Sequence, residues 1–305
     1  MSTISAKALN RILRIFLKPV MYLSWSLTMA RWITGLFDKL SGLFQSGIRS
    51  SPMMRSNYMA EWINEAPASD AGPVILYLPG GAFLMRTPNM HRSLVDRLTV
   101  AAGASSLLVF YRLAPEHPFP ACLEDAVDAY RYLLDSGVEP NQIVVVGDSA
   151  GGCLTLSTLL KLRDEELPMP AGGIVMSPVT DFTHSGESRT RNAKSDPVLS
   201  TNPRIDQNAL FLVDTPPDDP LASPAFADFS GLPPIMALVS DSEMLLDDTL
   251  AVQRKAEQAS VPFDLHIGRD LPHVWPLFKQ LQESSDSIRQ MASFIIRITS
   301  ARAGD

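Results

Sequence analysis

Ser149 stands in a short segment whose residue types suit a nucleophile. The segment reads Gly147-Asp148-Ser149-Ala150-Gly151-Gly152, follows the apolar run 143–146 and precedes a helix-like stretch that begins at Cys153. A G-x-S-x-G pattern between a buried strand and a helix is typical of a sharp turn that exposes the serine hydroxyl. Glycine is needed on both sides because a side chain there would crowd the turn. The turn also sets Ser149 at the positive end of the following helix, and we predict that it is a catalytic nucleophile.

A serine nucleophile needs a base, and the candidates are His91, His117, His184, His266 and His273. In folds with this turn, nucleophile, acid and base follow one another in that order along the chain. His91 and His117 precede Ser149, and His184 precedes any late acid. His266 stands inside an expected strand, where a packed or surface role fits better. His273, in a loop after that strand, remains, and we predict it to be the base.

The base in turn needs a carboxylate that orients its ring. Four acids follow the expected strand 235–240: Asp241, Glu243, Asp247 and Asp248. At least two of them must be bystanders that cap or solvate the start of the next helix. The chemistry of the residues does not decide between Asp241 and Glu243.

Charge that develops on a substrate oxygen must be met by N–H donors. Gly80, Gly81 and Ala82 follow the expected strand 74–78, and their small size allows a substrate carbonyl to approach the backbone. The amide of Ala150 is the complementary donor. A Pro-Gly-Gly alone is an ordinary turn, so this predicted oxyanion hole depends on the assignment of Ser149.

Alternating strands and helices position these residues. Strands are expected at 74–78, 105–111, 143–146, 173–177, 235–240 and 263–267, and helices at 90–102, 120–134, 153–160, 246–259 and 284–300. Several strands are near-continuous apolar runs, the pattern of a parallel sheet covered on both faces. In such sheets, sites form beyond the carboxyl ends of the strands, where the candidate residues stand. Residues 183–233 break the alternation, and we interpret them as an insertion that forms a lid.

Composition narrows the functional classes further. The chain has 305 residues, enough for one large domain with or without a lid, and a net charge of −7, which argues against general nucleic-acid binding. Its two cysteines, Cys122 and Cys153, indicate neither a disulfide framework nor a metal site. A reducing, cytoplasmic location is therefore expected.

The N-terminus has a different charge balance from the rest of the chain. Residues 1–37 contain five basic residues and no acidic one, and Lys7, Arg11, Arg14 and Lys18 share one helical face. We expect amphipathic helices packed on the main domain with the polar face outward, and weak membrane-surface contact stays open. A signal peptide would use the apolar run 19–30, but no A-x-A-like cleavage site follows. Arg31, Asp38 and Lys39 interrupt any transmembrane span.

Taken together, these segments resemble the hormone-sensitive-lipase-like family of α/β-hydrolase carboxylesterases over roughly residues 60–295. Residues 147–152 are similar to its nucleophile turn, and 111–120 with Asp125, 219–224 and 271–273 are similar to further signature stretches. The resemblance implies an α/β-hydrolase fold: a mostly parallel central sheet with helices on both faces and a helical cap. N-terminal helices in residues 1–50 and an insertion at about 183–215 would form the cap, and residues 51–305 the catalytic domain.

Two departures from the family pattern bear on the site. The family's H-G-G-G reads Pro79-Gly80-Gly81-Ala82 here. The missing histidine supports the loop rather than the chemistry, so activity is expected to survive. The family's D-x-L-x-D, aligned without gaps back from His273, begins at Glu243. The resemblance thus implies Glu243 as the acid, with Asp241 as the fallback.

The function implied is that of a serine carboxylesterase acting on short- to medium-chain acyl esters through an acyl-enzyme, with a small-molecule ester as partner and no metal or cofactor. A lactone, an acetylated small molecule or an amide is an alternative substrate for the same residues. A ligand-binding receptor on an inactive scaffold is a further alternative, but such relatives lose the histidine and His273 is present. A protein that works at lipid surfaces is a third, and a homodimer through a sheet edge also stays open.

Overall fold

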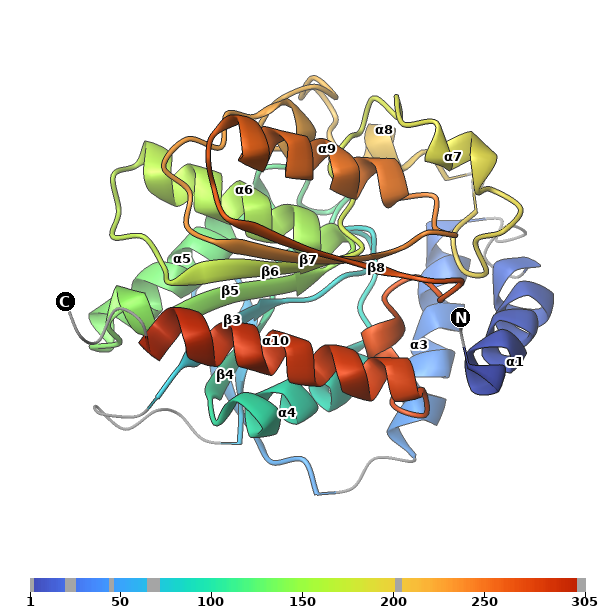
Figure 1. Cartoon of the computed structure of the whole chain (residues 1–305), viewed down its shortest axis with the longest axis horizontal. Helices are drawn as coiled ribbons and strands as arrows, with labels where there is room; N and C mark the ends of the chain where they lie inside the picture. The colour runs from blue at the N-terminus through green and yellow to red at the C-terminus, as the bar shows by residue number, and fades with distance from the viewer. Residues whose placement is uncertain (1–2, 20–25, 44–46, 65–71, 201–204, 301–305) are drawn as a thin grey trace.

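A single twisted sheet forms the centre of the molecule (Figure 1). The computed structural model describes residues 3–19, 26–43, 47–64, 72–200 and 205–300. Within these ranges the sheet has eight strands in the order β1-β2-β4-β3-β5-β6-β7-β8. They are β1 (Ser50–Met54), β2 (Met59–Ile63), β3 (Val74–Leu78), β4 (Ser105–Phe110), β5 (Ile143–Asp148), β6 (Gly172–Met176), β7 (Ile235–Ser240) and β8 (Phe263–Gly268). From β4 to β8 all neighbours are parallel, whereas β1 pairs antiparallel with β2, and β2 with β4.

The six strands expected from the sequence are confirmed to within two residues at each end. The antiparallel strands β1 and β2 were not anticipated. Four of the five β1 residues are exposed, and the strand contains Pro52, so its sequence lacks the apolar alternation that marks a strand. β1 lies at the sheet edge, where a proline costs no ladder hydrogen bond.

Helices cover both faces of the sheet. On one face lie α5 (Ala121–Asp135), α6 (Ala150–Asp164) and α9 (Leu246–Gln258), and on the other α4 (Pro88–Ala102) and α10 (Gln282–Ser300) (Figure 1). α4 shows why the helices begin and end where they do: it begins with Pro88 and ends before Gly103, which is left-handed at φ 58°. The expected helices are confirmed, with boundaries shifted by a few residues.

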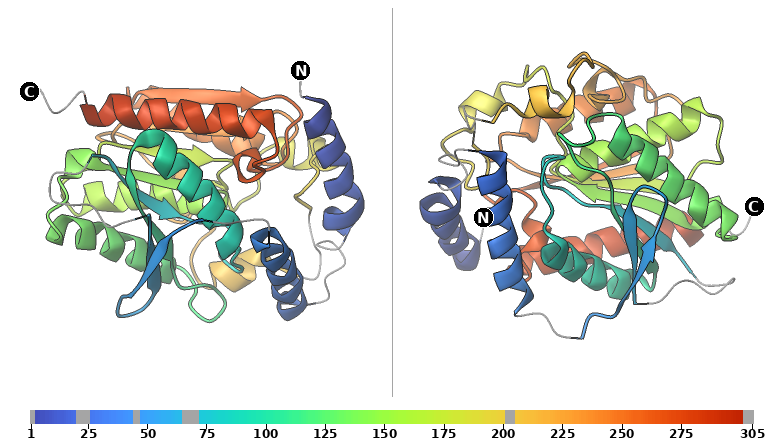
Figure 2. Two further views of the ribbon diagram at one scale, coloured as in Figure 1. Left: turned by 90° about the horizontal axis from the view of Figure 1, so that it is seen from below. Right: turned by 180° about the vertical axis from the view of Figure 1, so that it is seen from behind.

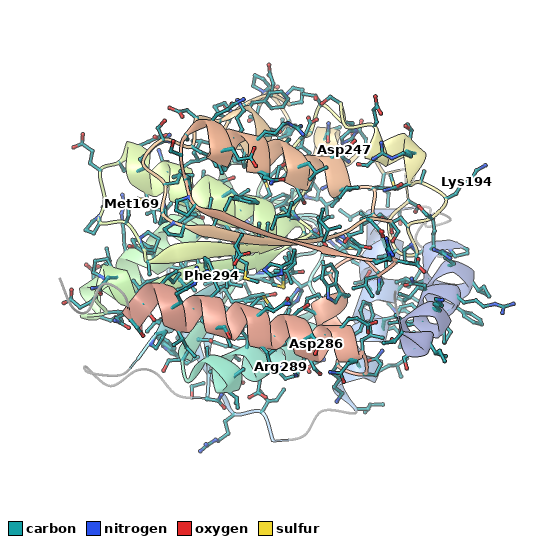
Figure 3. The ribbon with its side chains drawn as sticks, viewed as in Figure 1. Met169, Lys194, Asp247, Asp286, Arg289 and Phe294 are labelled. Atoms are coloured by element: carbon teal, nitrogen blue, oxygen red, sulfur yellow. The ribbon has the colours of Figure 1, made fainter. Side chains whose placement is uncertain are left out.

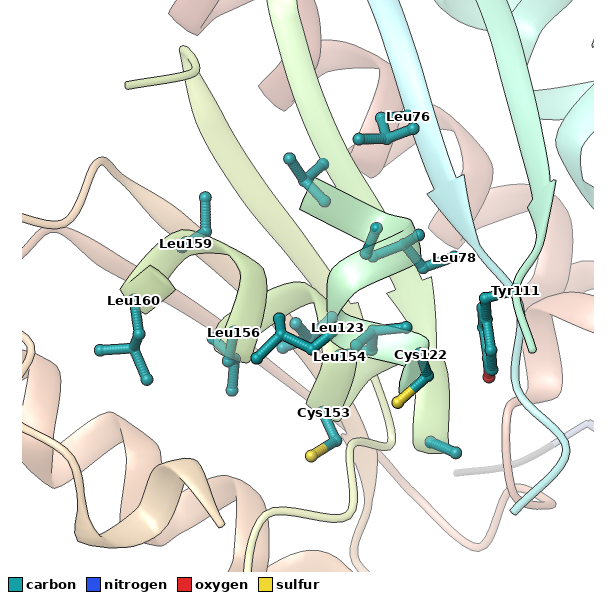
Figure 4. Packing of buried hydrophobic residues seen from close by; sticks show 14 of the residues in the cluster. Leu76, Leu78, Tyr111, Cys122, Leu123, Cys153, Leu154, Leu156, Leu159 and Leu160 are labelled. Atoms are coloured by element: carbon teal, nitrogen blue, oxygen red, sulfur yellow. The ribbon is translucent and has the colours of Figure 1, made fainter. Parts of the chain in front are cut away.

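The core on the α5–α6 side is built from leucines and both cysteines (Figure 4). Leu123 of α5 and Leu154 of α6 belong to the same buried cluster as Leu76 of the central strand β3. Cys122 and Cys153 are buried free thiols in this cluster, and burial raises the pKa of the Cys153 thiol to about 12. Both thiols therefore stay protonated and pack as small apolar groups.

The N-terminal helices and the insertion lie at the end of the sheet toward which the parallel strands run (Figures 1 and 2). They comprise α1 (Ile4–Ile12), the π-helix η1 (Leu13–Leu17), α3 (Leu27–Gly42), α7 (Ser188–Arg191) and α8 (Gln207–Phe211). The expected regions 1–50 and 183–215 are described only in part, since residues 20–25, 44–46 and 201–204 fall outside the described ranges. None of the helices described is long and apolar enough to cross a membrane. Half of the apolar run 19–30, residues 20–25, lies outside those ranges.

The prediction that these helices turn a polar face outward is wrong in detail. Lys18 Nζ donates to the carbonyls of Ala193 and Asp196 at 2.6 Å, and Arg14 donates to the carbonyl of Ser195. Part of the basic face of the first helix thus contacts the insertion. Large apolar side chains such as Trp32, 69% exposed, face outward instead.

Candidate active site

Ser149 occupies a strained turn between β5 and α6. Its backbone has φ 52° and ψ −118°, a conformation that L-residues rarely adopt. The flanking glycines leave no space for a side chain: a Cβ at Gly147 would lie 2.2 Å from the Gly151 carbonyl oxygen, and one at Gly151 would lie 1.9 Å from that of Leu78. The turn therefore requires glycine on both sides, as the sequence pattern indicates.

The structure brings three of the predicted site residues into one hydrogen-bonded chain. His273 Nε2 lies 2.9 Å from Ser149 Oγ, and His273 Nδ1 lies 2.7 Å from Glu243 Oε2. Glu243 is fully buried, and its other oxygen accepts hydrogen bonds from the Ser177 hydroxyl and the Ser240 amide at 2.8 Å each. With both oxygens occupied, the carboxylate is held in one orientation, and it fixes the imidazole ring in turn.

The other three acids after β7 have different partners. Asp241 is exposed and accepts from the Asp270 amide at 2.7 Å. Asp247 accepts from the Ser188 amide. Asp248 is buried, accepts from the Thr180 amide and pairs with Arg189 at 2.8 Å. Glu243, rather than the fallback Asp241, is therefore the acid in contact with His273.

The electrostatics of the site suit a base. Burial opposes a positive charge on His273, but the Glu243 carboxylate outweighs it, so the pKa of His273 is raised above its ordinary value. A neutral His273 has Nδ1–H toward Glu243 and a lone pair on Nε2 toward Ser149. The arrangement can take a proton from the hydroxyl and stabilise the imidazolium that results.

The loop after β3 departs from the prediction at one residue. The Gly80 amide donates to Asp148 Oδ1 at 3.0 Å, so Gly80 is not available as an oxyanion donor and its assignment is corrected. Within the described ranges, no intramolecular acceptor meets the amide of Gly81 or Ala82. Ala82 is left-handed at φ 57°, and a Cβ at Gly81 would lie 2.1 Å from the Met85 carbonyl oxygen. Ala150 contributes the first amide of α6, which has no partner within its helix.

A second histidine–carboxylate pair lies behind this loop and was missed. His91 of α4 and Asp148 are both buried, and His91 Nε2 lies 3.2 Å from Asp148 Oδ1. Burial opposes charge on each group, but Asp148 raises the pKa of His91, and His91 lowers the pKa of Asp148. The Tyr77 hydroxyl, at 2.8 Å, and the Gly80 amide donate to the same carboxylate. Asp148 thus joins the nucleophile turn to the loop that follows β3.

Pro79 stands where the family's H-G-G-G pattern has its histidine. The carbonyl of Pro79 accepts a 2.6 Å hydrogen bond from the Tyr111 hydroxyl, which is buried. Tyr111 belongs to the stretch 111–120 that the sequence singled out. Tyr111 therefore holds the loop through the Pro79 carbonyl, and Asp148 holds it through the Gly80 amide.

The insertion contacts the acid side of the site. The Asn192 side chain donates to the Glu243 carbonyl at 2.8 Å, and Asp196 accepts from the Met244 amide at 2.9 Å. Both residues follow α7 and are buried. The turn that carries Glu243 is therefore held partly from outside the sheet. Neither residue has a sequence signal of its own, since each contact joins segments about 50 residues apart.

An aromatic cluster joins the loop after β3 to the helix α8. Phe83 stacks on Phe211 with ring centroids 4.0 Å apart, and Phe119 and Phe182 also contact Phe211. Phe83 directly follows Ala82, and Gln207 of α8 donates to the Ala82 carbonyl. α8 therefore packs directly on the candidate oxyanion loop.

A separate cavity of about 590 Å³ lies between β8 and α10. Asp286, Arg289 and Phe294 of α10 line it (Figure 3) together with Asp264 and His266. It includes neither Ser149 nor His273 and takes no part in the site. In the described part of the chain, no three His, Cys, Asp or Glu side chains are grouped so that they could hold a metal ion.

Comparison with known proteins finds relatives over most of the chain. Residues 75–277 match a family model described as the alpha/beta hydrolase fold. The chain is 38% identical to an acetyl-hydrolase of Streptomyces hygroscopicus over 77% of its length and 79% of the relative's. It is 35% identical to an esterase of Acinetobacter venetianus, covering 85% of this chain and 86% of the other. A crystal structure of an esterase from the bacterial hormone-sensitive lipase family superposes with a TM-score of 0.89 at 35% identity, over 98% of this chain and 99% of that one.

Proposed function

This chain belongs to the α/β-hydrolase family, among the esterases related to bacterial hormone-sensitive lipase, and from this premise we propose that it hydrolyses esters through Ser149. It is a carboxylic ester hydrolase, and a small-molecule ester is its substrate. The observation that supports Ser149 is the unbroken chain from its hydroxyl through His273 to Glu243, with contacts of 2.9 and 2.7 Å. No other serine in the described ranges contacts His273 in this way.

In the proposed acylation step, Ser149 Oγ attacks the ester carbonyl carbon while His273 Nε2 takes the hydroxyl proton. Glu243 stabilises the imidazolium and keeps its ring in place. The amides of Gly81, Ala82 and Ala150 bind the negative oxygen of the tetrahedral intermediate. The imidazolium then gives its proton to the alkoxide leaving group, and an acyl-Ser149 and a free alcohol result.

In the proposed deacylation step, water enters where the alcohol left. His273 takes one of its protons, and the resulting hydroxide attacks the acyl carbon. The same amides bind the negative oxygen of the tetrahedral intermediate that forms in this step. Return of the proton to Ser149 Oγ breaks the ester bond to the enzyme and releases the carboxylic acid.

We further propose that residues 1–50 and the insertion 183–215 form a cap over the rest of the catalytic domain, residues 51–305, and restrict the acyl chain to short and medium lengths. The stacked rings of Phe83 and Phe211 support this limit, because the cap helix α8 thereby lies against the oxyanion loop. The name of the Streptomyces relative, an acetyl-hydrolase, also favours small acyl groups.

The test is hydrolysis of p-nitrophenyl esters, from acetate to palmitate, by the wild type and by Ser149→Ala. The proposal predicts turnover of short and medium chains that falls by about 10⁴-fold or more in the variant. A matched control is Ser185→Ala, since Ser185 hydrogen-bonds to Asp181 away from His273. Equal rates for the wild type and Ser149→Ala would refute the serine mechanism, and fastest turnover of palmitate would refute the chain-length limit.

A further inference from the structure

The outward face of α3 is apolar along its whole length. It is formed by Met29, Trp32, Leu36, Leu40 and Leu43, which succeed one another at intervals of three or four residues and so share one side of the helix. Their exposed fractions run from 42% for Met29 to 76% for Leu43. The buried residues of α3 are Ala30, Ile33 and Asp38. Among the described residues, α3 therefore has one face packed on the protein and a second, apolar face that is exposed.

The first helix repeats this arrangement. Ile12, Ile15 and Phe16 are 53%, 55% and 63% exposed, while Ala6 and Leu13 are buried. α1, η1 and α3 lie at the same end of the molecule in all three views (Figures 1 and 2). We call eight of the exposed apolar residues of these helices the docking face: Ile12, Ile15, Phe16, Met29, Trp32, Leu36, Leu40 and Leu43.

The charges beside the docking face are positive. Lys7, Arg11 and Lys39 are exposed. The acids that contact the first helix have partners there: Glu283 accepts from the Thr3 amide, and Asp270 accepts from the Asn10 side chain and lies 3.8 Å from Arg14. Asp38 is itself buried, where it accepts from the amides of Asn89 and Met90. A cationic apolar face thus stands on a chain whose net charge is −7.

We propose that the docking face binds an anionic lipid surface, with the helices lying along it. Aromatic and aliphatic side chains such as Trp32 and Phe16 would enter the boundary between headgroups and acyl chains, and Lys7, Arg11 and Lys39 would meet the lipid phosphates. A second copy of the chain fits less well, because pairing two such faces would bring their cations together. The inference goes beyond hydrolysis at Ser149 and holds whichever residue attacks the ester.

α3 also contacts the segment that follows the candidate oxyanion loop. Arg31 of α3 donates to the carbonyl of Leu84 at 2.7 Å and forms a two-pronged ion pair with Glu116. Leu84 lies two residues after Ala82 in the candidate oxyanion loop. A lipid surface on the outer side of α3 would therefore lie one helix away from the loop that binds the substrate carbonyl.

The experiment is co-sedimentation of the full chain with vesicles of phosphatidylglycerol and phosphatidylcholine, compared with vesicles of phosphatidylcholine alone. The proposal predicts binding to the anionic vesicles that weakens by about tenfold in Trp32→Ser with Leu36→Ser. Lys7→Glu with Arg11→Glu should weaken binding to the anionic vesicles by about fivefold for each basic residue lost. Added salt should also weaken this binding, because it screens the attraction between the basic residues and the lipid phosphates. Val100→Ser is the matched control, since Val100 of α4 is 70% exposed and lies outside the docking face.

The circular dichroism spectrum and the melting temperature without vesicles should be unchanged in all these variants, which shows that they fold. The proposal is overturned if the wild type does not sediment with anionic vesicles, or if the double variants sediment as the wild type does. Concentration-dependent dimers in light scattering that Trp32→Ser abolishes would also overturn it and assign the face to a second copy.

Discussion

Two histidine–carboxylate pairs flank Ser149, and only one of them has the geometry of a base. His273 with Glu243 and His91 with Asp148 are both buried, and in each pair the carboxylate raises the pKa of the imidazole. The difference lies in the second ring nitrogen. That of His273 faces the Ser149 hydroxyl at 2.9 Å, whereas that of His91 donates to the Thr87 carbonyl at 2.9 Å. The two ring nitrogens of His91 face Thr87 and Asp148, and neither faces Ser149, so this pair can hold a position but is not placed to take the serine proton.

The largest contrast is expected between substitutions of the two histidines. His273→Gln should lower kcat for p-nitrophenyl acetate by about 10⁴- to 10⁶-fold, because it removes the base. His91→Gln should lower kcat far less, by about 10- to 100-fold. Steady-state kinetics of both variants, with circular dichroism as the check on folding, measures the contrast. Equal losses in the two variants would remove the distinction drawn here.

The acid of the first pair is the next test. Glu243→Gln should lower kcat by about 10⁴-fold, since the amide neither selects the required ring tautomer nor balances the imidazolium charge. Asp241→Asn is the matched control, because Asp241 follows the same strand but is exposed and contacts Asp270 instead. Its kcat should stay within about twofold of the wild type. A larger loss in Asp241→Asn than in Glu243→Gln would assign the acid to Asp241.

Substitution of His91, in the pair with Asp148, should have a smaller effect that falls on kcat rather than on KM. His91→Gln loosens Asp148 and with it the Gly80 amide, so the neighbouring oxyanion donors are less well placed. We expect kcat to fall by about 10- to 100-fold with little change in KM, less than the loss of a whole oxyanion donor would cause. Kinetics over a range of substrate concentrations measures both constants. A lower melting temperature with an unchanged kcat would make the pair purely structural.

The smallest effect is a shift along the pH axis. His273 acts when neutral, so kcat/KM should rise with pH through the pKa of His273, which Glu243 holds above 6.5. Removing that negative charge in Glu243→Gln lowers the pKa, so the acid limb of the residual activity should move to lower pH. In His91→Gln the acid limb of the pH profile should lie at the same pH as in the wild type. A limb that moved in His91→Gln but not in Glu243→Gln would reverse the roles of the two pairs.

Local signals were enough to single out Ser149 and His273, which lie 2.9 Å apart in the structure, and most of the strands of the sheet. Ser149 stands between a strand and a helix with glycines on both sides, and these neighbouring residues indicate the sharp turn. Chain order set aside His91, His117 and His184, and the position of His266 inside an expected strand set that histidine aside. The chemistry of the acids could not separate Asp241 from Glu243. The separation depends on a tight turn, in which the Glu243 amide donates to the Ser240 carbonyl and the Ser240 amide donates back to the Glu243 side chain.

Features that depend on distant contacts were missed. The Gly80 amide is occupied by a carboxylate 68 residues away, and His91 meets the same group across 57 residues. No local pattern reports such pairs. The N-terminal helices were expected to turn polar residues outward, but Lys18 is used against the insertion and Trp32 is left exposed. A helical pattern shows which residues share a face, but it does not show which face the rest of the chain covers.

The most direct test of the central claim is the mass of the enzyme after treatment with diethyl p-nitrophenyl phosphate. This reagent phosphorylates a serine whose hydroxyl is activated by a neighbouring base. The account predicts one diethylphosphoryl group per chain, on the peptide that contains Ser149, with loss of esterase activity in parallel and no labelling in His273→Gln. Labelling at another residue, or full activity in a chain labelled at Ser149, would contradict it.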